Sequence, residues 1–169
     1  MKTIFSTALL SAGLSVVLPA AVMAATAILK LPDGKEMGML SLVQTGDGVK
    51  ITGTVSGLEP GEHAFHIHET GKCDPPDFKS AGGHFNPLGT PHGKHGGGPH
   101  AGDMDNLTAG DDGKVAIDVV NGRVSLNPNG KISVFDADGS AIVIHAGPDD
   151  YSSQPSGAAG SRVACGVIQ

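Results

Sequence analysis

Short segments that alternate apolar and polar residues recur along the chain, and they constrain the fold more than any other feature of the sequence. Successive side chains of a β-strand point to opposite faces, so this alternation indicates strands with one buried face. Gly-, Pro- and Asp-containing turns separate most of the segments, and none has a sustained helical period. We therefore predict an all-β, eight-stranded antiparallel sandwich or barrel. The predicted strands cover residues 26–31, 37–44, 49–56, 63–68, 114–120, 131–137, 140–146 and 162–168.

Two long stretches interrupt the regular spacing of the strands. Residues 69–113 are rich in Gly, Pro, His and Asp, and residues 146–161 form the second stretch. A long segment without its own strands inside a compact domain is either disordered or functional. The first stretch contains Cys73 and several histidines, and metal binding together with a disulfide can order such a loop. We predict two functional loops, with a mobile, low-complexity loop as the alternative.

The N-terminal segment has the order typical of a secretory signal peptide. Lys2 is followed by an apolar run and then by small residues ending at Ala24. The alternative is a membrane anchor, but Pro19 and several Ser, Thr and Gly residues interrupt the run and no charged flank follows. We predict a signal peptide over residues 1–24 and one β domain over residues 25–169. No later segment is apolar enough to span a bilayer, so we expect no membrane contact after signal removal.

Charge and cysteine content restrict the partners and the compartment. Eleven Lys and Arg residues against 17 Asp and Glu give a net charge of −6, with no basic stripe, which argues against a nucleic-acid partner. The two cysteines, Cys73 and Cys165, lie in a chain that we expect to be exported. An even count in an oxidising compartment favours one disulfide. Two reduced thiols or two metal ligands are the alternatives.

The stretch EHAFHIHE, residues 62–69, places three histidines within six positions. On a strand, His66 and His68 share one face, and His63 shares the other face with Phe65 and Ile67. A face that carries Phe and Ile is a core face, so we expect His63 to pack inward. Two imidazoles at i and i+2 are well placed to bind one metal ion, and an exposed pair on a hydrated face is the alternative.

Further candidate metal ligands are spread along the rest of the chain. Imidazoles with a carboxylate suit Zn(II) and Cu(II) better than iron–sulfur or Cu(I) thiolate chemistry. Adventitious binding by a His-rich loop is the alternative, but it does not account for the strand pair, the carboxylate and the isolated histidine at the end of an apolar strand. The candidates are His66, His68, His84, His92, His95, His100, Asp103 and His145.

Several motifs, in this order and spacing, resemble the copper–zinc superoxide dismutases of the exported bacterial type. The resemblance extends over residues 26–169 and implies a Greek-key form of the predicted β fold. It also implies one copper ion and one zinc ion per subunit. The motifs are HAFHIHE, CDPPDFKSAGGHFNP, HAGDMDNL, IVIHAGPDDY and GSRVACGVI.

The resemblance assigns a ligand set to each metal ion. It implies that His84 is an imidazolate that bridges the two ions, since two flanking cations stabilise the loss of both ring protons. Four nitrogens suit Cu(II), and three histidines with one aspartate suit tetrahedral Zn(II). The implied copper ligands are His66, His68, His84 and His145, and the implied zinc ligands are His84, His92, His100 and Asp103.

Two further residues match functional positions of the family. Asp149 matches a carboxylate that hydrogen-bonds one ligand of each metal and so fixes ring orientation. The sequence alone favours a turn aspartate beside Pro148. Arg162 matches the arginine that guides the substrate, although by itself it reads as a surface arginine at the start of a strand. The Cys73–Cys165 disulfide would hold the copper-side loop against the final strand.

The chain departs from the family pattern in two places. His95 is an additional histidine between His92 and His100, and it is either a bystander or a competitor of His92 for zinc. We prefer His92 because its spacing from His84 matches the family. The loop 146–161 is shorter than in animal relatives and lacks their charged steering residues, and Lys72 and Lys79 are candidates for that role.

The resemblance implies a periplasmic enzyme that converts superoxide to dioxygen and hydrogen peroxide. His84 and Arg162 would be the catalytic residues, with His84 leaving copper and accepting a proton when copper is reduced. The alternatives are a periplasmic copper or zinc buffer or metal-delivery module, and a structural, matrix-binding sandwich. The complete ligand set and Arg162 favour the enzyme. A homodimer is open, because the sequence does not show which strand faces are interfaces.

Overall fold

In the computed structural model, residues 22–94 and 98–169 are described, and they form an almost entirely β structure with one short 3₁₀ helix, η1. The predicted signal segment lies outside the described residues up to residue 21, as does His95. The elements are β1 (Ala24–Lys30), β2 (Glu36–Thr45), β3 (Gly48–Ser56), β4 (Gly61–His63), β5 (Phe65–His68), η1 (Lys79–Ala81), β6 (Leu107–Ala109), β7 (Lys114–Asn121), β8 (Ala141–His145) and β9 (Arg162–Val167).

Seven of the strands form one curled antiparallel sheet, in the order β5-β8-β9-β1-β2-β3-β7, and β4 pairs with β6 in a second sheet. β5 lies beside β8, and β3 lies beside β7, although these partners are far apart in the sequence. Such crossings are typical of Greek-key connections. The curled antiparallel architecture confirms the predicted fold class.

Alternation along the strands directs the apolar side chains into one core. In β5 and β8, Phe65 pairs with Ile144 and Ile67 pairs with Ile142, and all four side chains are completely buried. The intervening pair, His66 and Val143, points to the opposite face of the same sheet. His66 and His68 therefore share a face, as the alternation predicts. These histidines and the core therefore lie on opposite faces of the same strand.

The opposite face of β8 and β9 is also covered, which explains the unbroken apolar run of β8. A second buried cluster lies there, in which side chains of the loop that follows β5 pack on side chains of β8 and β9. Its members are Phe78, Ala81, Ala141, Val143 and Cys165. A strand buried on both faces needs apolar side chains at every position. Residues of the loop 69–84 thus pack directly against the sheet.

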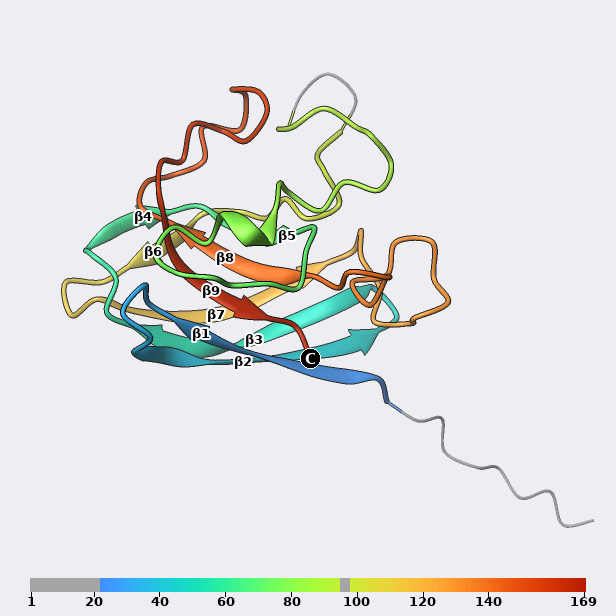
Figure 1. Cartoon of the computed structure of the whole chain (residues 1–169), viewed down its shortest axis with the longest axis horizontal. Coiled ribbons are helices and arrows are strands. Elements are labelled where there is room, and N and C mark those ends of the chain that lie inside the picture. The colour runs from blue at the N-terminus through green and yellow to red at the C-terminus, as the bar shows by residue number, and fades with distance from the viewer. Residues whose placement is uncertain (1–21, 95–97) are drawn as a thin grey trace, which may run out of the picture.

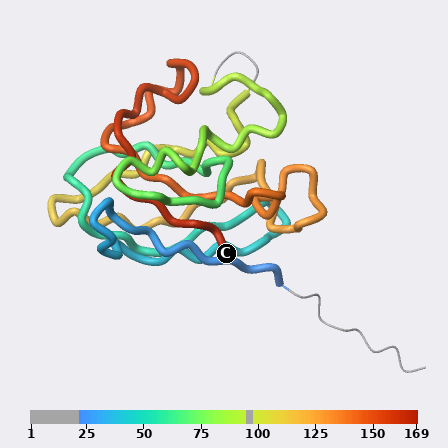
Figure 2. The backbone as a smooth tube through the Cα atoms, viewed as in Figure 1, coloured from blue at the N-terminus to red at the C-terminus, as the bar shows by residue number. Residues whose placement is uncertain are grey.

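Both long loops rise on the same side of the sheet, above β5 and β8 (Figure 1). The backbone trace in Figure 2 shows the segment around residues 70–94 beside the segment around residues 146–161. Within the described part of the chain, no helix is long and apolar enough to cross a membrane. The two loops bring distant parts of the sequence together over the His66 face.

The predicted strand over residues 131–137 is wrong. This segment belongs to an irregular loop, in which Ser133 makes only an isolated bridge to Ser125. Val134 is buried and Ile132 and Phe135 are partly buried, so the apolar residues anchor the loop to the core. The Ser133 hydroxyl accepts a hydrogen bond from the Phe135 N–H at 3.1 Å. Such local side-chain bonds compete with strand pairing.

The predicted strand over residues 63–68 is divided into two. Ala64 separates β4, which pairs with β6, from β5, which pairs with β8. His63 is buried as expected, and its two ring nitrogens lie 2.7 Å from the His145 carbonyl oxygen and 2.8 Å from that of Glu59. This histidine is a structural link and does not belong to the group formed by His66 and His68.

Candidate metal centre

The candidate site is built on β5 and on the loop that runs along its free edge. The Ile67 N–H donates to the Gly102 carbonyl oxygen at 2.9 Å, and the Phe85 N–H donates to that of Ile67 at 2.8 Å. A Cβ atom at Gly102 would lie 2.2 Å from the Ile67 carbonyl oxygen, so only glycine permits this approach. Isolated bridges join His66 to Asp103 and His68 to His84.

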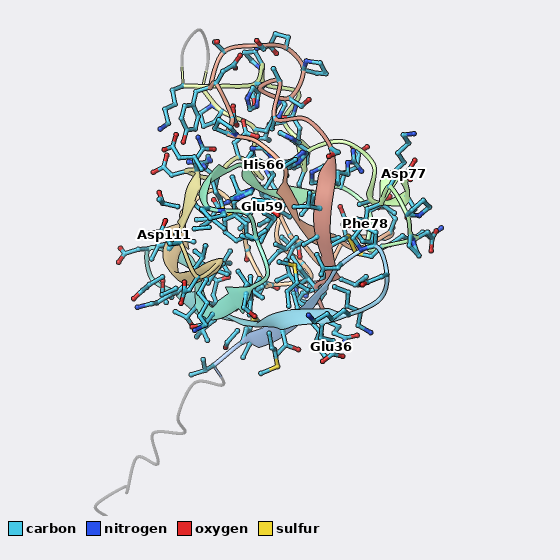
Figure 3. All side chains as sticks on the ribbon, turned by 90° about the vertical axis from the view of Figure 1, so that its left-hand side faces the viewer. Glu36, Glu59, His66, Asp77, Phe78 and Asp111 are labelled. Carbon is cyan, nitrogen blue, oxygen red and sulfur yellow. A yellow bond between two sulfur atoms is a disulfide. The ribbon has the colours of Figure 1, made fainter. Side chains whose placement is uncertain are left out.

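Seven of the eight predicted ligand positions form two groups of four that share one residue. In each group the potential ligand atoms lie within 4.8 Å of one another, and every residue is buried. The first group is His66, His68, His84 and His145, and the second is His84, His92, His100 and Asp103. His84 is the shared residue, and its ring centroid lies 3.9 Å from that of His66 and 5.4 Å from that of His100. In Figure 3, His66 lies in the interior, beneath the two loops.

Hydrogen bonds leave one defined nitrogen free on each ring of the first group. The Nδ1–H of His68 donates to the Gly82 carbonyl oxygen at 3.0 Å, and that of His145 donates to the Gly160 carbonyl oxygen at 3.3 Å. Their Nε2 atoms then face each other at 3.4 Å. Two neutral imidazoles cannot share a proton when both Nε2 atoms are acceptors, so this pair is arranged to share a cation.

Asp149 joins the two groups through its two carboxylate oxygens. Oδ2 accepts from His66 Nε2–H at 2.8 Å, and Oδ1 accepts from His92 Nε2–H at 2.9 Å. Oδ1 also accepts from the Tyr151 N–H at 2.7 Å, which is the local turn bond that the sequence alone favours. The aspartate is buried, and it fixes the tautomers of one histidine from each group.

The residues fit metal ions because three of their buried ring nitrogens have no hydrogen-bond partner among the described residues. Among the described residues, four buried side-chain atoms lack a hydrogen bond, and three of them are His66 Nδ1, His84 Nε2 and His92 Nδ1. His92 Nδ1 lies 2.9 Å from Asp103 Oδ2 without making a hydrogen bond. Buried polar atoms are normally paired, so a cluster of free nitrogens beside a carboxylate indicates bound cations.

The lowered pKa values of the ligand side chains keep them in their metal-binding forms. Burial lowers the pKa of His66, His68 and His100 and brings that of His145 to about 3. Burial raises the pKa of Asp103, but the His84 hydrogen bond and the neighbouring histidines together lower it well below its usual range. Neutral imidazoles and a charged carboxylate are the forms that bind metal ions.

We expect the metal-free chain to lose stability as the pH falls below 6.5. The unfolded chain binds a proton at residue 145 near pH 6.5, whereas the folded chain resists it until pH about 3, so protonation favours unfolding throughout that window. Asp149 acts in the same direction only below about pH 3.8, because burial raises its pKa whereas its bonds to His66 and His92 lower it to about 2. Urea unfolding should show a loss of about 2 kcal/mol between pH 6.5 and pH 5. Equal stability at both values would contradict the burial of neutral His145.

Arg162, at the start of β9, is held beside the first group by two loop carbonyls. Nη1 donates to the Phe78 carbonyl oxygen at 2.7 Å, and Nη2 donates to that of Gly82 at 2.6 Å. Arg162 pairs with His145 across β8 and β9. The guanidinium is therefore fixed near the first group and is not a free surface cation. The Cys73–Cys165 disulfide is present as predicted and joins the same loop to β9.

The two candidate steering lysines differ in their surroundings. Lys79 Nζ lies 2.7 Å from Asp77 Oδ2 in an exposed ion pair, and Lys72 is also exposed. In Figure 3, Asp77 lies at the periphery of the molecule. A role of these lysines in steering stays a prediction.

Two residues that bind the backbone of site residues were not predicted from the sequence. Asn106 Nδ2 donates to the Asp149 carbonyl oxygen at 3.0 Å, and Asn106 Oδ1 accepts from the Asp149 N–H at 2.9 Å. Arg123 donates through Nη2 to the Asp103 carbonyl oxygen. Asn106 and Arg123 bind backbone atoms of residues that are distant in the sequence, so residue spacing does not predict these contacts.

Comparisons with known proteins point to one family of enzymes. The sequence profile of the family described as Copper/zinc superoxide dismutase (SODC) matches residues 36–168. The chain is 54% identical over 138 residues to "Superoxide dismutase [Cu-Zn] 1" of Aquifex aeolicus (strain VF5), which covers 80% of this chain and 82% of that protein. It is 45% identical over 150 residues to "Superoxide dismutase [Cu-Zn]" of Caulobacter vibrioides, covering 86% and 85% of the two chains.

Solved structures give the same result for the fold. A SOD-like protein from Bacillus subtilis matches with a TM-score of 0.82 and 41% identity, covering 85% of this chain and 97% of that chain. The Cu/Zn superoxide dismutase from Brucella abortus matches with a TM-score of 0.70 and 31% identity, covering 87% of this chain and 100% of that chain.

Proposed function

Because this chain belongs to the copper/zinc superoxide dismutase family, we propose that its two histidine groups form the copper and zinc sites of an exported superoxide dismutase. His66, His68, His84 and His145 would hold copper, and His84, His92, His100 and Asp103 would hold zinc. The observation that carries this proposal is His84, whose two ring nitrogens face two complete ligand groups. A protein that only stores one kind of ion has no need for a ligand shared between two sites.

Copper held by His66, His68, His84 and His145 would supply the one-electron redox chemistry, between Cu(II) and Cu(I), that disproportionation of superoxide requires. The residues of the chain supply orientation and protons. Arg162, fixed by two carbonyls, attracts and orients the anion beside the first group. His84 Nε2, which has no hydrogen-bond partner in the part of the chain that the structure describes, is the atom that takes up and releases a proton. Asp149 keeps His66 and His92 in the tautomers that direct Nδ1 inward.

Purified chain tests the proposal directly. Copper and zinc per chain are measured by elemental analysis, and superoxide removal is assayed before chelation, after chelation and after each metal is restored. We expect one copper and one zinc per chain, and activity that requires copper. Metal binding without superoxide removal in the fully loaded protein would favour a metal buffer.

We expect Arg162→Ala to lower kcat/KM for superoxide by roughly tenfold while both metals stay bound, because a local cation accelerates capture of an anion. The difference from the unmodified enzyme should shrink as salt rises, since screening weakens attraction at a distance. Pulse radiolysis over a range of ionic strength measures both effects. Arg162→Lys is the matched control, because it keeps the charge but lacks the planar fork that reaches two carbonyls. Unchanged rates for Arg162→Ala would rule out the guiding role.

We also propose that residues 1–24 direct the chain to the periplasm and are then removed, leaving the domain 25–169. The disulfide and the similarity to bacterial superoxide dismutases support export. Fractionation of cells that express the chain with and without residues 1–24 tests this. Equal recovery of both forms in the cytoplasm would contradict it.

A further inference from the structure

The peptide group between Gly82 and Gly83 connects the first histidine group to Arg162. Its carbonyl oxygen accepts two hydrogen bonds, from His68 Nδ1–H at 3.0 Å and from Arg162 Nη2 at 2.6 Å. The orientation of this one carbonyl therefore affects both a proposed copper ligand and the proposed guiding arginine. The carbonyl itself must be held in place by further contacts of the same peptide group.

The other end of the same peptide group is bound by Glu69. The Gly83 N–H donates to Glu69 Oε1 at 2.8 Å, and the Glu69 N–H donates to the Gly83 carbonyl oxygen at 3.0 Å. Gly82 has φ +75°, and a Cβ atom there would lie 2.7 Å from both Cγ and Oε1 of Glu69. The glycine thus allows the carboxylate to approach, and a side chain at this position would force it away.

A peptide group is planar, so its N–H and its carbonyl turn together. A carboxylate that accepts from the N–H makes a charge-assisted bond, and it also polarises the carbonyl at the opposite end. We propose that Glu69 is a positioning residue that fixes His68 and Arg162 together through the 82–83 peptide group. This inference deepens the proposed function and rests on it, because the roles of His68 and Arg162 belong to that proposal.

Glu69 has a second effect that an experiment must separate from the first. Burial lowers the pKa of Arg162, and the negative charges of Asp77 and Glu69 act against that lowering. Loss of either charge strengthens the attraction for superoxide, which opposes the effect of a displaced arginine. Asp77 bonds to the Lys79 side chain and backbone and not to the 82–83 peptide group, so Asp77→Asn is a matched control for charge alone.

Superoxide kcat/KM is measured for fully metallated Glu69→Ala, Glu69→Gln and Asp77→Asn from low to high salt. At about 1 M salt the Debye length is about 3 Å, so the charge effect is screened and the positional effect remains. There we expect Glu69→Ala to be roughly twofold to threefold slower than the unmodified enzyme, as for the loss of one weak hydrogen bond, and no slower than Arg162→Ala at the same salt, because the arginine is displaced and not removed. Glu69→Gln retains an acceptor oxygen and should recover most of the rate, and Asp77→Asn should match the unmodified enzyme.

A second pair of variants addresses the donor. Gly83→Pro removes the N–H and should reproduce Glu69→Ala, with no further loss when the two are combined. Gly83→Ala retains the N–H, and its Cβ would lie 3.5 Å from Glu69 Oε1, an ordinary contact, so it should behave like the unmodified enzyme. Additive losses in the Gly83→Pro, Glu69→Ala double variant would overturn the proposal that Glu69 acts through the 82–83 peptide group.

A spectroscopic readout separates positioning from a general loss of structure. In the reduced enzyme both metal ions are diamagnetic, so the proton resonances of His68 Nδ1–H and the Gly83 amide can be followed by NMR. We expect both to shift in Glu69→Ala, with the His145 Nδ1–H resonance unchanged, and neither to shift in Asp77→Asn. Unshifted His68 together with normal high-salt rates in Glu69→Ala would overturn the inference. Failure of the unmodified, loaded enzyme to remove superoxide would instead refute the proposed function. The NMR shifts would still test whether Glu69 positions His68 through the 82–83 peptide group.

Discussion

Replacing His84 with alanine will weaken both metal sites at once and remove superoxide turnover. The residue belongs to both ligand groups, and its Nδ1 lies 2.8 Å from Asp103 Oδ1, while its Nε2 has no hydrogen-bond partner within residues 22–94 and 98–169. Loss of a group that only orients a ligand costs ten- to a hundredfold in metal affinity, so loss of the shared ligand should cost at least about a hundredfold for each ion. Competition titrations with chelators of known affinity measure copper and zinc separately.

Two variants at unshared ligands serve as controls for His84→Ala. His145 belongs only to the first group and His100 only to the second. We expect His145→Ala to weaken copper binding with little change in zinc affinity, and His100→Ala to do the reverse. If His84→Ala lowers the affinity for only one ion, the shared position is wrong and the two sites are independent.

The local part of this site could be predicted from the sequence because it depends on strand geometry alone. Alternation along β5 separates Phe65 and Ile67 from His66 and His68, and the structure shows the same separation. His145 falls on the face of His66 for the same reason, since it follows Val143 by two positions in β8. A period of two is a property of the backbone, so it does not require knowledge of the rest of the fold.

The loop contacts could not be predicted from residue patterns, because they depend on where distant segments meet. Asp149 shows this clearly: its bond to the Tyr151 N–H is local and readable as a turn, whereas its bonds to His66 and His92 cross more than 50 positions of sequence. Only the family resemblance pointed to the second role. The carbonyl of Gly82 carries no side-chain signal, so neither pattern nor resemblance identified the acceptor shared by His68 and Arg162.

The wrong strand over residues 131–137 has a related cause. Its alternating apolar residues do reach the core, with Val134 completely buried, but they do so from a loop. Alternation reports which side chains are buried, and a strand additionally needs a partner for its backbone. The Ser133 hydroxyl accepts from the Phe135 N–H, and the backbone of Ser125 pairs with Ile132 and Val134, so part of that backbone is satisfied without a ladder.

Removal of the disulfide by Cys73→Ser with Cys165→Ser should lower the free energy of unfolding by about 2–5 kcal/mol, the usual cost for a native disulfide in a small exported domain. The two residues are 92 positions apart, so the link restricts a large part of the unfolded chain. Guanidinium unfolding of the metal-free chain measures the effect, and reduction of the unmodified chain should give a similar loss.

The same double variant should also reduce activity, because the disulfide holds the loop that supplies the Arg162 acceptors. Phe78 lies five positions after Cys73, and its carbonyl receives Arg162 Nη1. Phe78 and Ala81 still pack on Ala141 and Val143 without the sulfur link, so we expect the loop to loosen but to stay on the sheet. The expected result is a kcat/KM lowered severalfold with copper and zinc still bound, and with a smaller further loss from Arg162→Ala than in the intact enzyme. A full additional loss from Arg162→Ala would show that the arginine keeps its position without the disulfide, and that the link acts on stability alone.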